Sequence, residues 1–367
     1  MKKQLAYILL ITMCTLISCA KTPDSIQSNN HKTGLNNKYS YVSVDHILDD
    51  FDEAFETEYT KFKLPDKSSV IINQPEEVCD LQLKFVNLEK DMNWLKEKVY
   101  KLTETFNVKS YGDLESIGKT AYILANENEQ VRVDMFSEPY YYFSKDEISL
   151  NNMTLEKIEY IDRIKEKNLN KKYNEIIDKS VDCANKINKE FGGALTNIPL
   201  DLYIRNYKGE EFYELNLQPT YKGIGVQCIT PTYSNEYIEN DNIIISDLFD
   251  MRLLYNTNLK LYLYVSCNNY TSSMSEPIDK IISFRGACDI LEEELASNVS
   301  MKFDDVKLWY EPRSSIGVLE ESNKNIKCTP KWFFISDNEE DSGLYHAINY
   351  VTVDCVTGEI EVFFPGS

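Results

Sequence analysis

The stretch LDLYIRNYKGEEFYELNL, residues 200–217, decides the fold class of this chain. Apolar side chains recur with a period of two along 200–204 and 212–217, as they do in β-strands. Lys208-Gly209 lies between the two runs and predicts a turn. Runs with strand character continue without an intervening helix, at 221–229, 242–246 and 259–265. So long a helix-free stretch predicts an antiparallel sheet.

Helical patterns precede this β region. Apolar residues recur at helical spacing over 44–62, 88–106 and 154–191, and Gly192-Gly193 ends the third helix. Short strands are predicted at 70–72, 79–85, 121–124, 131–135 and 140–143. Because helices and strands do not alternate regularly, the order predicts a multi-lobed α+β fold with mainly antiparallel sheets and packed helices.

The composition is that of a folded, acidic protein. The 367 residues include 39 basic and 59 acidic side chains, for a formal net charge of −20, and 43% are hydrophobic. These values exclude a mainly disordered chain, a collagen and a multi-span membrane protein. The acid excess repels nucleic acids and anionic lipid headgroups, so neither is expected as a partner.

The N-terminus predicts export and lipid anchoring. Met1-Lys2-Lys3 precedes an uncharged, mostly apolar stretch, 5–18, which is too short to span a bilayer and suits a signal-peptide core. Leu16-Ile17-Ser18-Cys19 resembles the lipobox of bacterial lipoproteins, although Ile17 is bulkier than usual. The resemblance implies cleavage before Cys19 and a diacylglycerol on its sulfur, which anchors the protein to the outer face of the cytoplasmic membrane. The alternatives are an uncleaved signal anchor and plain secretion.

Four segments follow from these patterns. They are the signal peptide 1–18, a polar flexible tether 19–38, an α+β body 39–270 of one or two lobes, and a C-terminal module 275–367. The 33 lysines against 6 arginines are typical of an AT-rich bacterial genome, such as a clostridial one.

Cysteine and histidine patterns predict neither a metal site nor a redox motif. Cys14 leaves with the signal peptide, and seven cysteines remain besides Cys19, without any C-x-x-C spacing: Cys79, Cys183, Cys228, Cys267, Cys288, Cys328 and Cys355. An odd number leaves at least one free thiol; buried free cysteines are the simpler interpretation, and at least one disulfide is the alternative. The three histidines, His31, His46 and His346, lie far apart and form no paired-ligand motif.

The C-terminal module carries a second resemblance. A helix beginning after Ser283 is followed by strands at 306–310 and 330–335, and by a hairpin whose strands, 351–355 and 360–363, flank Gly358. The helix, the Trp332 strand and the sequence Val353-Asp354-x-x-Thr357-Gly358-Glu359-Ile360 together resemble PepSY-type modules of Firmicutes lipoproteins. That resemblance, over about a quarter of the chain, implies a helix packed on a small antiparallel sheet and a role in peptidase inhibition or protein regulation. The alternative is an unrelated α+β domain with an ordinary hairpin.

Enzyme signatures are missing from the sequence. It contains no phosphate loop and no G-x-S-x-G or S-x-x-K nucleophile motif. The acidic run 337–343 departs from a calcium loop in its glycine position and lacks the distal Glu, so a solvated loop is expected. The aromatic run Tyr140-Tyr141-Tyr142-Phe143 suits a strand and core better than sugar stacking. No catalytic residue, cofactor or metal is therefore predicted.

Three functions remain open. The leading hypothesis is a non-enzymatic binding or regulatory lipoprotein whose 275–367 module docks an extracellular protein or peptide by adding a strand to a sheet edge. The alternatives are a carboxylate-dependent extracellular hydrolase, and a solute- or glycan-binding lipoprotein of a transporter. A carboxylate pair in a polar cleft would favour the hydrolase, and a tyrosine-lined cleft would favour solute capture.

Overall fold

The fold was examined in a computed structural model of the chain. It describes residues 39–70, 72–85, 92–108, 115–117, 121–125, 129–134, 140–145, 150–160, 170–227, 236–239, 242–245, 251–266, 270–273, 276–296, 300–315, 325–337 and 348–363. The predicted signal peptide, Cys19 and the tether lie outside these residues.

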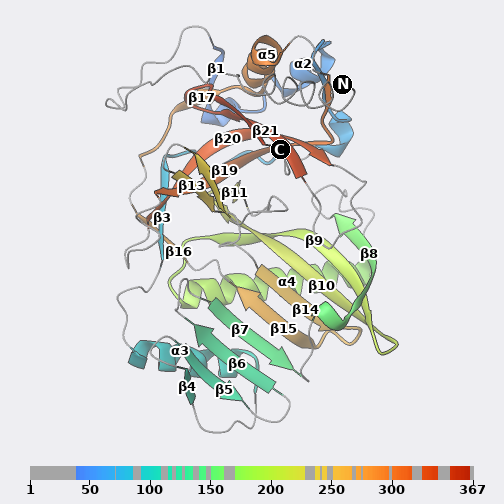
Figure 1. The fold of residues 1–367 in the computed structure, drawn as a ribbon, viewed down its shortest axis with the longest axis vertical. Helices are drawn as coiled ribbons and strands as arrows, with labels where there is room; N and C mark the ends of the chain where they lie inside the picture. The colour runs from blue at the N-terminus through green and yellow to red at the C-terminus, as the bar shows by residue number, and fades with distance from the viewer. Residues whose placement is uncertain are drawn as a thin grey trace, which may run out of the picture. The chain divides into compact units, whose positions relative to one another are not determined.

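A large antiparallel sheet forms one part of the structure (Figure 1). Its strands pair in the order β8 (Thr154–Tyr160), β9 (Thr196–Tyr207), β10 (Glu210–Tyr221), β14 (Met251–Asn256), β15 (Leu261–Ser266), β7 (Tyr140–Lys145), β6 (Glu129–Asp134), β5 (Ala121–Ala125) and β4 (Glu115–Ile117). The predicted turn at Lys208-Gly209 joins β9 to β10, with Gly209 at φ +84°.

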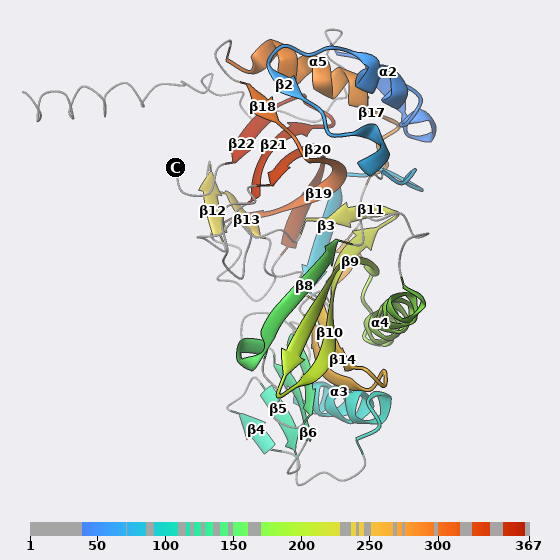
Figure 2. The ribbon, with the colours of Figure 1, turned by 90° about the vertical axis from the view of Figure 1, so that its right-hand side faces the viewer.

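Two helices cover one face of this large sheet. They are α3 (Met92–Thr105) and α4 (Lys171–Glu190), which Figure 2 shows on the same side of the strands. Val99 and Leu102 of α3 and Ile176 and Ile187 of α4 share a hydrophobic core with alternate residues of the strands, such as Leu215. The helix α4 begins at the Asn170 cap and ends before Gly192, whose φ of +84° suits a glycine after a helix.

A second sheet contains most of the C-terminal region. Its strands pair in the order β22 (Ile360–Phe363), β21 (Ile348–Asp354), β20 (Asn325–Asp337) and β19 (Asp305–Ser315). On the other side of β19, the strand β13 (Asn242–Ile245) pairs with β19 and is itself paired with β12 (Glu236–Glu239). The first half of β20 pairs with β3 (Leu81–Phe85), and β3 pairs in turn with β16 (Tyr270–Ser273). The strand β11 (Ile224–Val226) pairs with β10 and also, in parallel, with β19, so it joins the two sheets.

Short strands of the N-terminal segment pair with strands of the C-terminal region. They are β1 (Tyr41–Ser43), paired with β17 (Lys280–Ile282), and β2 (Phe62–Lys63), paired in parallel with β18 (Met301–Lys302). The helices α2 (Phe51–Glu56) and α5 (Phe284–Glu294) lie together. Short 3₁₀ turns occur at Val44–His46, Lys67–Ser69 and Leu150–Asn152. The predicted α+β class with mainly antiparallel sheets is thus confirmed.

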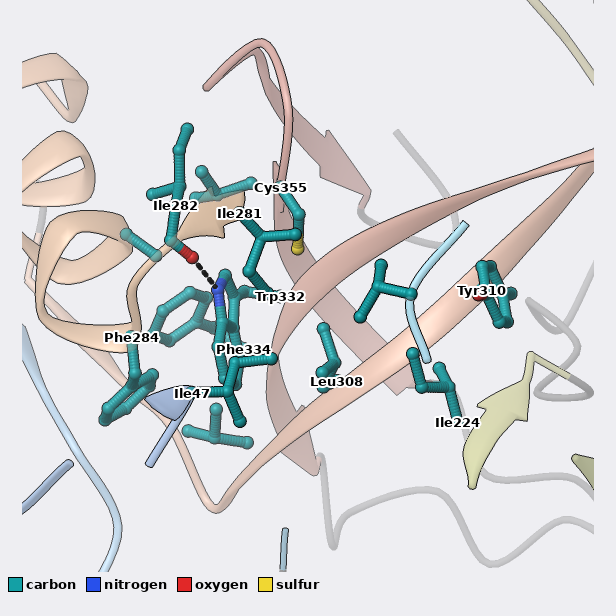
Figure 3. Packing of buried hydrophobic residues seen from close by; sticks show 14 of the residues in the cluster. Ile47, Ile224, Ile281, Ile282, Phe284, Leu308, Tyr310, Trp332, Phe334 and Cys355 are labelled. Carbon is teal, nitrogen blue, oxygen red and sulfur yellow. Dashed lines mark hydrogen bonds between the residues drawn. The ribbon is translucent and has the colours of Figure 1, made fainter. Parts of the chain in front are cut away.

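The core of the second sheet draws on both ends of the chain. Trp332 is fully buried, and its indole N–H donates to the Ile282 carbonyl at 2.9 Å, as Figure 3 shows. Phe284 of α5 packs on Trp332, while Ile47 and Val78 from the N-terminal segment belong to the same core. The boundary between the α+β body and the C-terminal module, predicted near residues 270–275, stays a prediction. Residues on the N-terminal side of that boundary contribute to this shared core.

Two predicted helical stretches were wrong in part. Residues 154–160 form β8, because their main chain pairs with β9. Over 44–62 the only α-helix is α2, which ends before Thr57, and the chain then bends towards β2 without forming a helix. The Glu292 carboxylate of α5 accepts from the N–H groups of Thr60 and Lys61, so a tertiary contact replaces the hydrogen bonds of a continuing helix. The strand predicted at 70–72 is also wrong at its two described residues, which are not in a strand.

The glycine of the C-terminal hairpin has two independent constraints. Gly358 has φ +74°, and a Cβ built there would lie 2.7 Å from the Tyr39 ring. Gly209 has a similar φ of +84°, with nothing within 4 Å of such a Cβ. We expect Gly209→Ala to lower the free energy of unfolding by about 1 kcal/mol, because it introduces backbone strain alone. Gly358→Ala should lower it by about 1–3 kcal/mol more than Gly209→Ala, because the new methyl group also meets the Tyr39 ring. Urea unfolding of both variants measures this, and equal losses would contradict the predicted clash.

Candidate functional site

The hairpin between β21 and β22 is built by the residues that carry the PepSY-type resemblance. The Asp354 carboxylate accepts from the N–H groups of Val356 and Thr357, at 2.9 and 2.8 Å. The Thr357 hydroxyl accepts from the Glu359 N–H at 3.2 Å, and Gly358 supplies the positive φ. In this geometry the signature shapes the turn. Its role is to set the position of the strand that follows.

That strand, β22, has an open side among the described residues. The register described for it is with β21 alone. The Asp354 N–H donates to the Glu359 carbonyl at 2.9 Å. Because bonded and non-bonded pairs alternate along an antiparallel ladder, the N–H groups of Ile360 and Val362 point away from β21. The Val362 side chain is 48% exposed, which is unusual for a large apolar residue in this structure.

A buried ion cluster lies behind β22. It consists of Glu311 and Arg313 of β19, Lys331 of β20 and Glu361 of β22, on the sheet face opposite Trp332. The Lys331 ammonium contacts Glu311 at 2.6 Å and Glu361 at 2.7 Å. Arg313 contacts Glu311 at 2.7 Å and pairs with Glu361 as well. Two positive charges therefore offset two negative charges in one place.

Electrostatics favour the ionised forms of Glu311 and Lys331 in this cluster. Burial raises the pKa of Glu311, but Lys331 and Arg313 outweigh burial and hold that pKa below its usual range. Burial lowers the pKa of Lys331, yet the two glutamates outweigh it and the pKa is raised. For Glu361 burial dominates, so its pKa is raised although Lys331 opposes the shift. Of the two carboxylates in the cluster, Glu361 is therefore the one that is protonated more easily.

The cluster is better suited to structure than to catalysis. Glu311 is fully buried and both carboxylates contact cations, so neither faces an open substrate site. Near the cluster the Gln227 amide donates to the Tyr350 hydroxyl at 3.1 Å. Sequence reasoning missed this cluster, because its members come from three strands. The available signal was a charged residue beside apolar or proline neighbours in each of the three strands: Glu311 and Arg313 on either side of Pro312, Lys331 before Trp332, and Glu361 between Ile360 and Val362.

The cysteines singled out in the sequence are free thiols where the structure describes them. Cys79, Cys288, Cys328 and Cys355 are buried, and Cys183 is half-buried. Burial raises the pKa of Cys183 to about 12, so its thiol is unreactive near neutral pH. Cys228 and Cys267 lie outside the described residues.

The other predicted positions are not brought together. His46 pairs with Asp49 at 2.8 Å on the surface, while His31, His346 and most of the 337–343 run lie outside the described residues. Phe143 is buried and stacks on Phe106, with 4.6 Å between ring centroids, as expected for a core residue. Among the described residues, no group of three histidine, cysteine or acidic side chains is placed to hold a metal ion. Within the same part of the chain, no helix has the length and apolarity needed to cross a membrane.

Comparison with known proteins gives a likeness of fold. No protein-family model and no curated protein matches the chain. The structure is similar to the crystal structure, at 1.45 Å resolution, of an uncharacterized protein from Eubacterium rectale ATCC 33656. The TM-score is 0.53 with 12% sequence identity, over 83% of this chain and 92% of that chain. The shared α+β architecture therefore extends over most of both proteins.

Removing the shared cation tests the structural role of the cluster. We expect Lys331→Met to lower the free energy of unfolding by about 3 kcal/mol, because two buried carboxylates then share only Arg313. Lys302→Met, which removes an exposed cation paired with Asp304, is the control and should cost less than about 1 kcal/mol. Urea unfolding at neutral pH measures both, and equal effects would contradict the assignment.

The same variant predicts a pH dependence. Loss of Lys331 raises the pKa of Glu361 further above that of the unfolded chain, so the folded variant binds the proton more tightly. A raised folded-state pKa favours folding at low pH. The deficit of Lys331→Met relative to wild type should therefore shrink as the pH falls from neutral towards the ordinary glutamate range.

Proposed function

We propose that the protein is a lipoprotein, anchored through Cys19 to the outer face of the cytoplasmic membrane, that binds an extracellular protein or peptide without catalysing a reaction. The observation that carries the binding role is the open side of β22. Its outward N–H groups at Ile360 and Val362 and the exposed Val362 side chain suit the addition of an extended segment.

The ion cluster supports this role of β22. Sheet edges are commonly protected from strand addition by charged side chains, which oppose pairing. The only charged residue of β22 is Glu361, and Lys331 and Arg313 neutralise it within the sheet. The edge therefore presents main-chain donors without an uncompensated charge on the strand itself.

The PepSY-type resemblance points in the same direction. Modules of that type are associated with peptidase inhibition and protein regulation, and here the resembling residues build the turn that positions β22. In the described part of the chain, the carboxylate pair Glu311 and Glu361 is neutralised by cations, which does not favour the hydrolase alternative.

A proline on the edge tests strand addition. Val362→Pro removes one outward N–H and leaves the bonds to β21 in place, so the melting temperature should change little. Binding of the partner should weaken about fivefold, which is the equivalent of one lost hydrogen bond of about 1 kcal/mol. Val362→Ala is the matched control, because it removes the side chain and keeps the N–H.

Recovery of a partner by crosslinking in cells that make the protein is the measurement. Strand addition requires recovery with wild type and Val362→Ala, and reduced recovery with Val362→Pro. Undiminished recovery with both Val362→Pro and Ile360→Pro would exclude this binding mode.

The lipid anchor is tested at Cys19. Replacement by Ala removes the sulfur that carries the diacylglycerol, so the Cys19→Ala protein should appear in the medium instead of the membrane fraction. Fractionation with and without detergent measures this. A variant that stays in the membrane and needs detergent for release would show that the anchor is a retained signal helix.

A further inference from the structure

The apolar core of the second sheet ends at an exposed rim on β22. Val362 pairs with Val351 of β21, which is fully buried in that core. Directly paired residues share a face, so Val362 lies on the core face of the sheet. Ile360 lies on the same face and packs against the core, whereas the Val362 side chain is 48% exposed. An apolar side chain placed beside Val362 would therefore extend the core by one position.

The other face of β22 carries carboxylates. Glu361 lies there with the ion cluster. The Asp354 N–H donates to the Glu359 carbonyl at 2.9 Å, so the ladder between the two strands continues to this pair. Asp354 also pairs with Lys331 of β20, and directly paired residues share a face. Asp354 and Glu359 therefore lie on the face of the cluster, next to the turn.

These two carboxylates give that end of β22 a negative charge. The ion cluster is balanced, with two carboxylates and two cations, so Asp354 and Glu359 add their charges to a neutral group. The Asp354 carboxylate accepts from two N–H groups of the turn. Glu359 is exposed and forms no ion pair within the described part of the chain. In a protein of formal net charge −20, this position favours a cation.

The two features define a pattern for an added strand. Val362 and Glu359 are three positions apart, so they point to opposite faces and lie about 10 Å apart, at about 3.3 Å per residue. The neighbouring strands of this sheet are antiparallel. An antiparallel segment would place an apolar residue opposite Val362 and a basic residue three positions further on, opposite Glu359. A neutral residue suits the position opposite Glu361, whose charge the cluster already balances.

We propose that the segment bound at β22 is a basic, extended peptide, with the order apolar, neutral, apolar, basic over the four positions from Val362 to Glu359. This inference rests on the strand addition proposed above and names the chemistry of its partner. Cross-strand apolar pairs and opposite-charge pairs stabilise strand pairing, and like charges directly opposite each other destabilise it. The same carboxylate therefore selects basic segments and excludes acidic ones.

Three fluorescently labelled peptides test the pattern against the purified, folded protein: a basic peptide SVTVKS, an acidic peptide SVTVES and a polar peptide SSTSKS. Fluorescence anisotropy gives their affinities. We expect the basic peptide to bind most tightly, and the acidic and polar peptides to bind about fivefold more weakly. Because the charge pair is exposed to solvent, the difference between the basic and acidic peptides should shrink as the salt concentration rises.

Variants locate the binding. Glu359→Lys should reverse the preference, so that the acidic peptide binds more tightly than the basic one. Glu175→Lys is the matched control, because it makes the same charge change at an exposed position of α4, and it should keep the preference for the basic peptide. Val362→Pro should weaken the basic peptide about fivefold, which places the peptide at this edge. Melting temperatures without peptide show whether each variant is folded.

Two results would overturn the basic-peptide proposal while leaving strand addition intact. They are equal affinities of the basic and acidic peptides, and a preference that Glu359→Lys does not change. Failure of the basic peptide to bind at millimolar concentration would overturn it as well. Strand addition itself is then judged by recovery of the cellular partner with Val362→Pro, which depends on no chosen peptide sequence.

Discussion

The hydrogen bond from the Trp332 indole to the Ile282 carbonyl, inside the core of the second sheet, is the contact on which the C-terminal half depends. A buried indole needs an acceptor, and Ile282 directly precedes the Ser283 cap of α5. The bond thus sets where α5 begins. The helix α5 in turn binds the chain at Thr60 and Lys61 through Glu292, which brings the N-terminal segment into the same core.

Successive side chains of the strand β20 point to opposite faces of the sheet, and the two faces are different environments. Trp332 and Phe334 point into the core beneath α5, while Lys331 points to the other face and joins the ion cluster. A buried ion cluster adds less stability than a well-packed apolar one of similar size, so its value here is to hold Glu361, and with it β22, in one register. The consequence is a strand, β22, whose one charged side chain is compensated.

The binding surface proposed at the β22 edge uses main-chain donors, which would recognise an extended backbone with little regard to its side chains. The sheet that contains β22 and the large sheet are joined in the described structure by β11.

Local signals by themselves determined the α+β class, the β9–β10 hairpin, the C-terminal end of α4 and the start of α5, because turns, caps and side-chain periods act over a few residues. They also predicted the last hairpin, down to its positive-φ glycine. Only the tertiary structure decided that 154–160 is a strand and that 57–61 is not helical, since the partners of those main chains lie on β9 and α5. It alone placed Glu311, Lys331 and Glu361 in one cluster. Strand order and register bring these residues together across long sequence separations, and no local pattern encodes either.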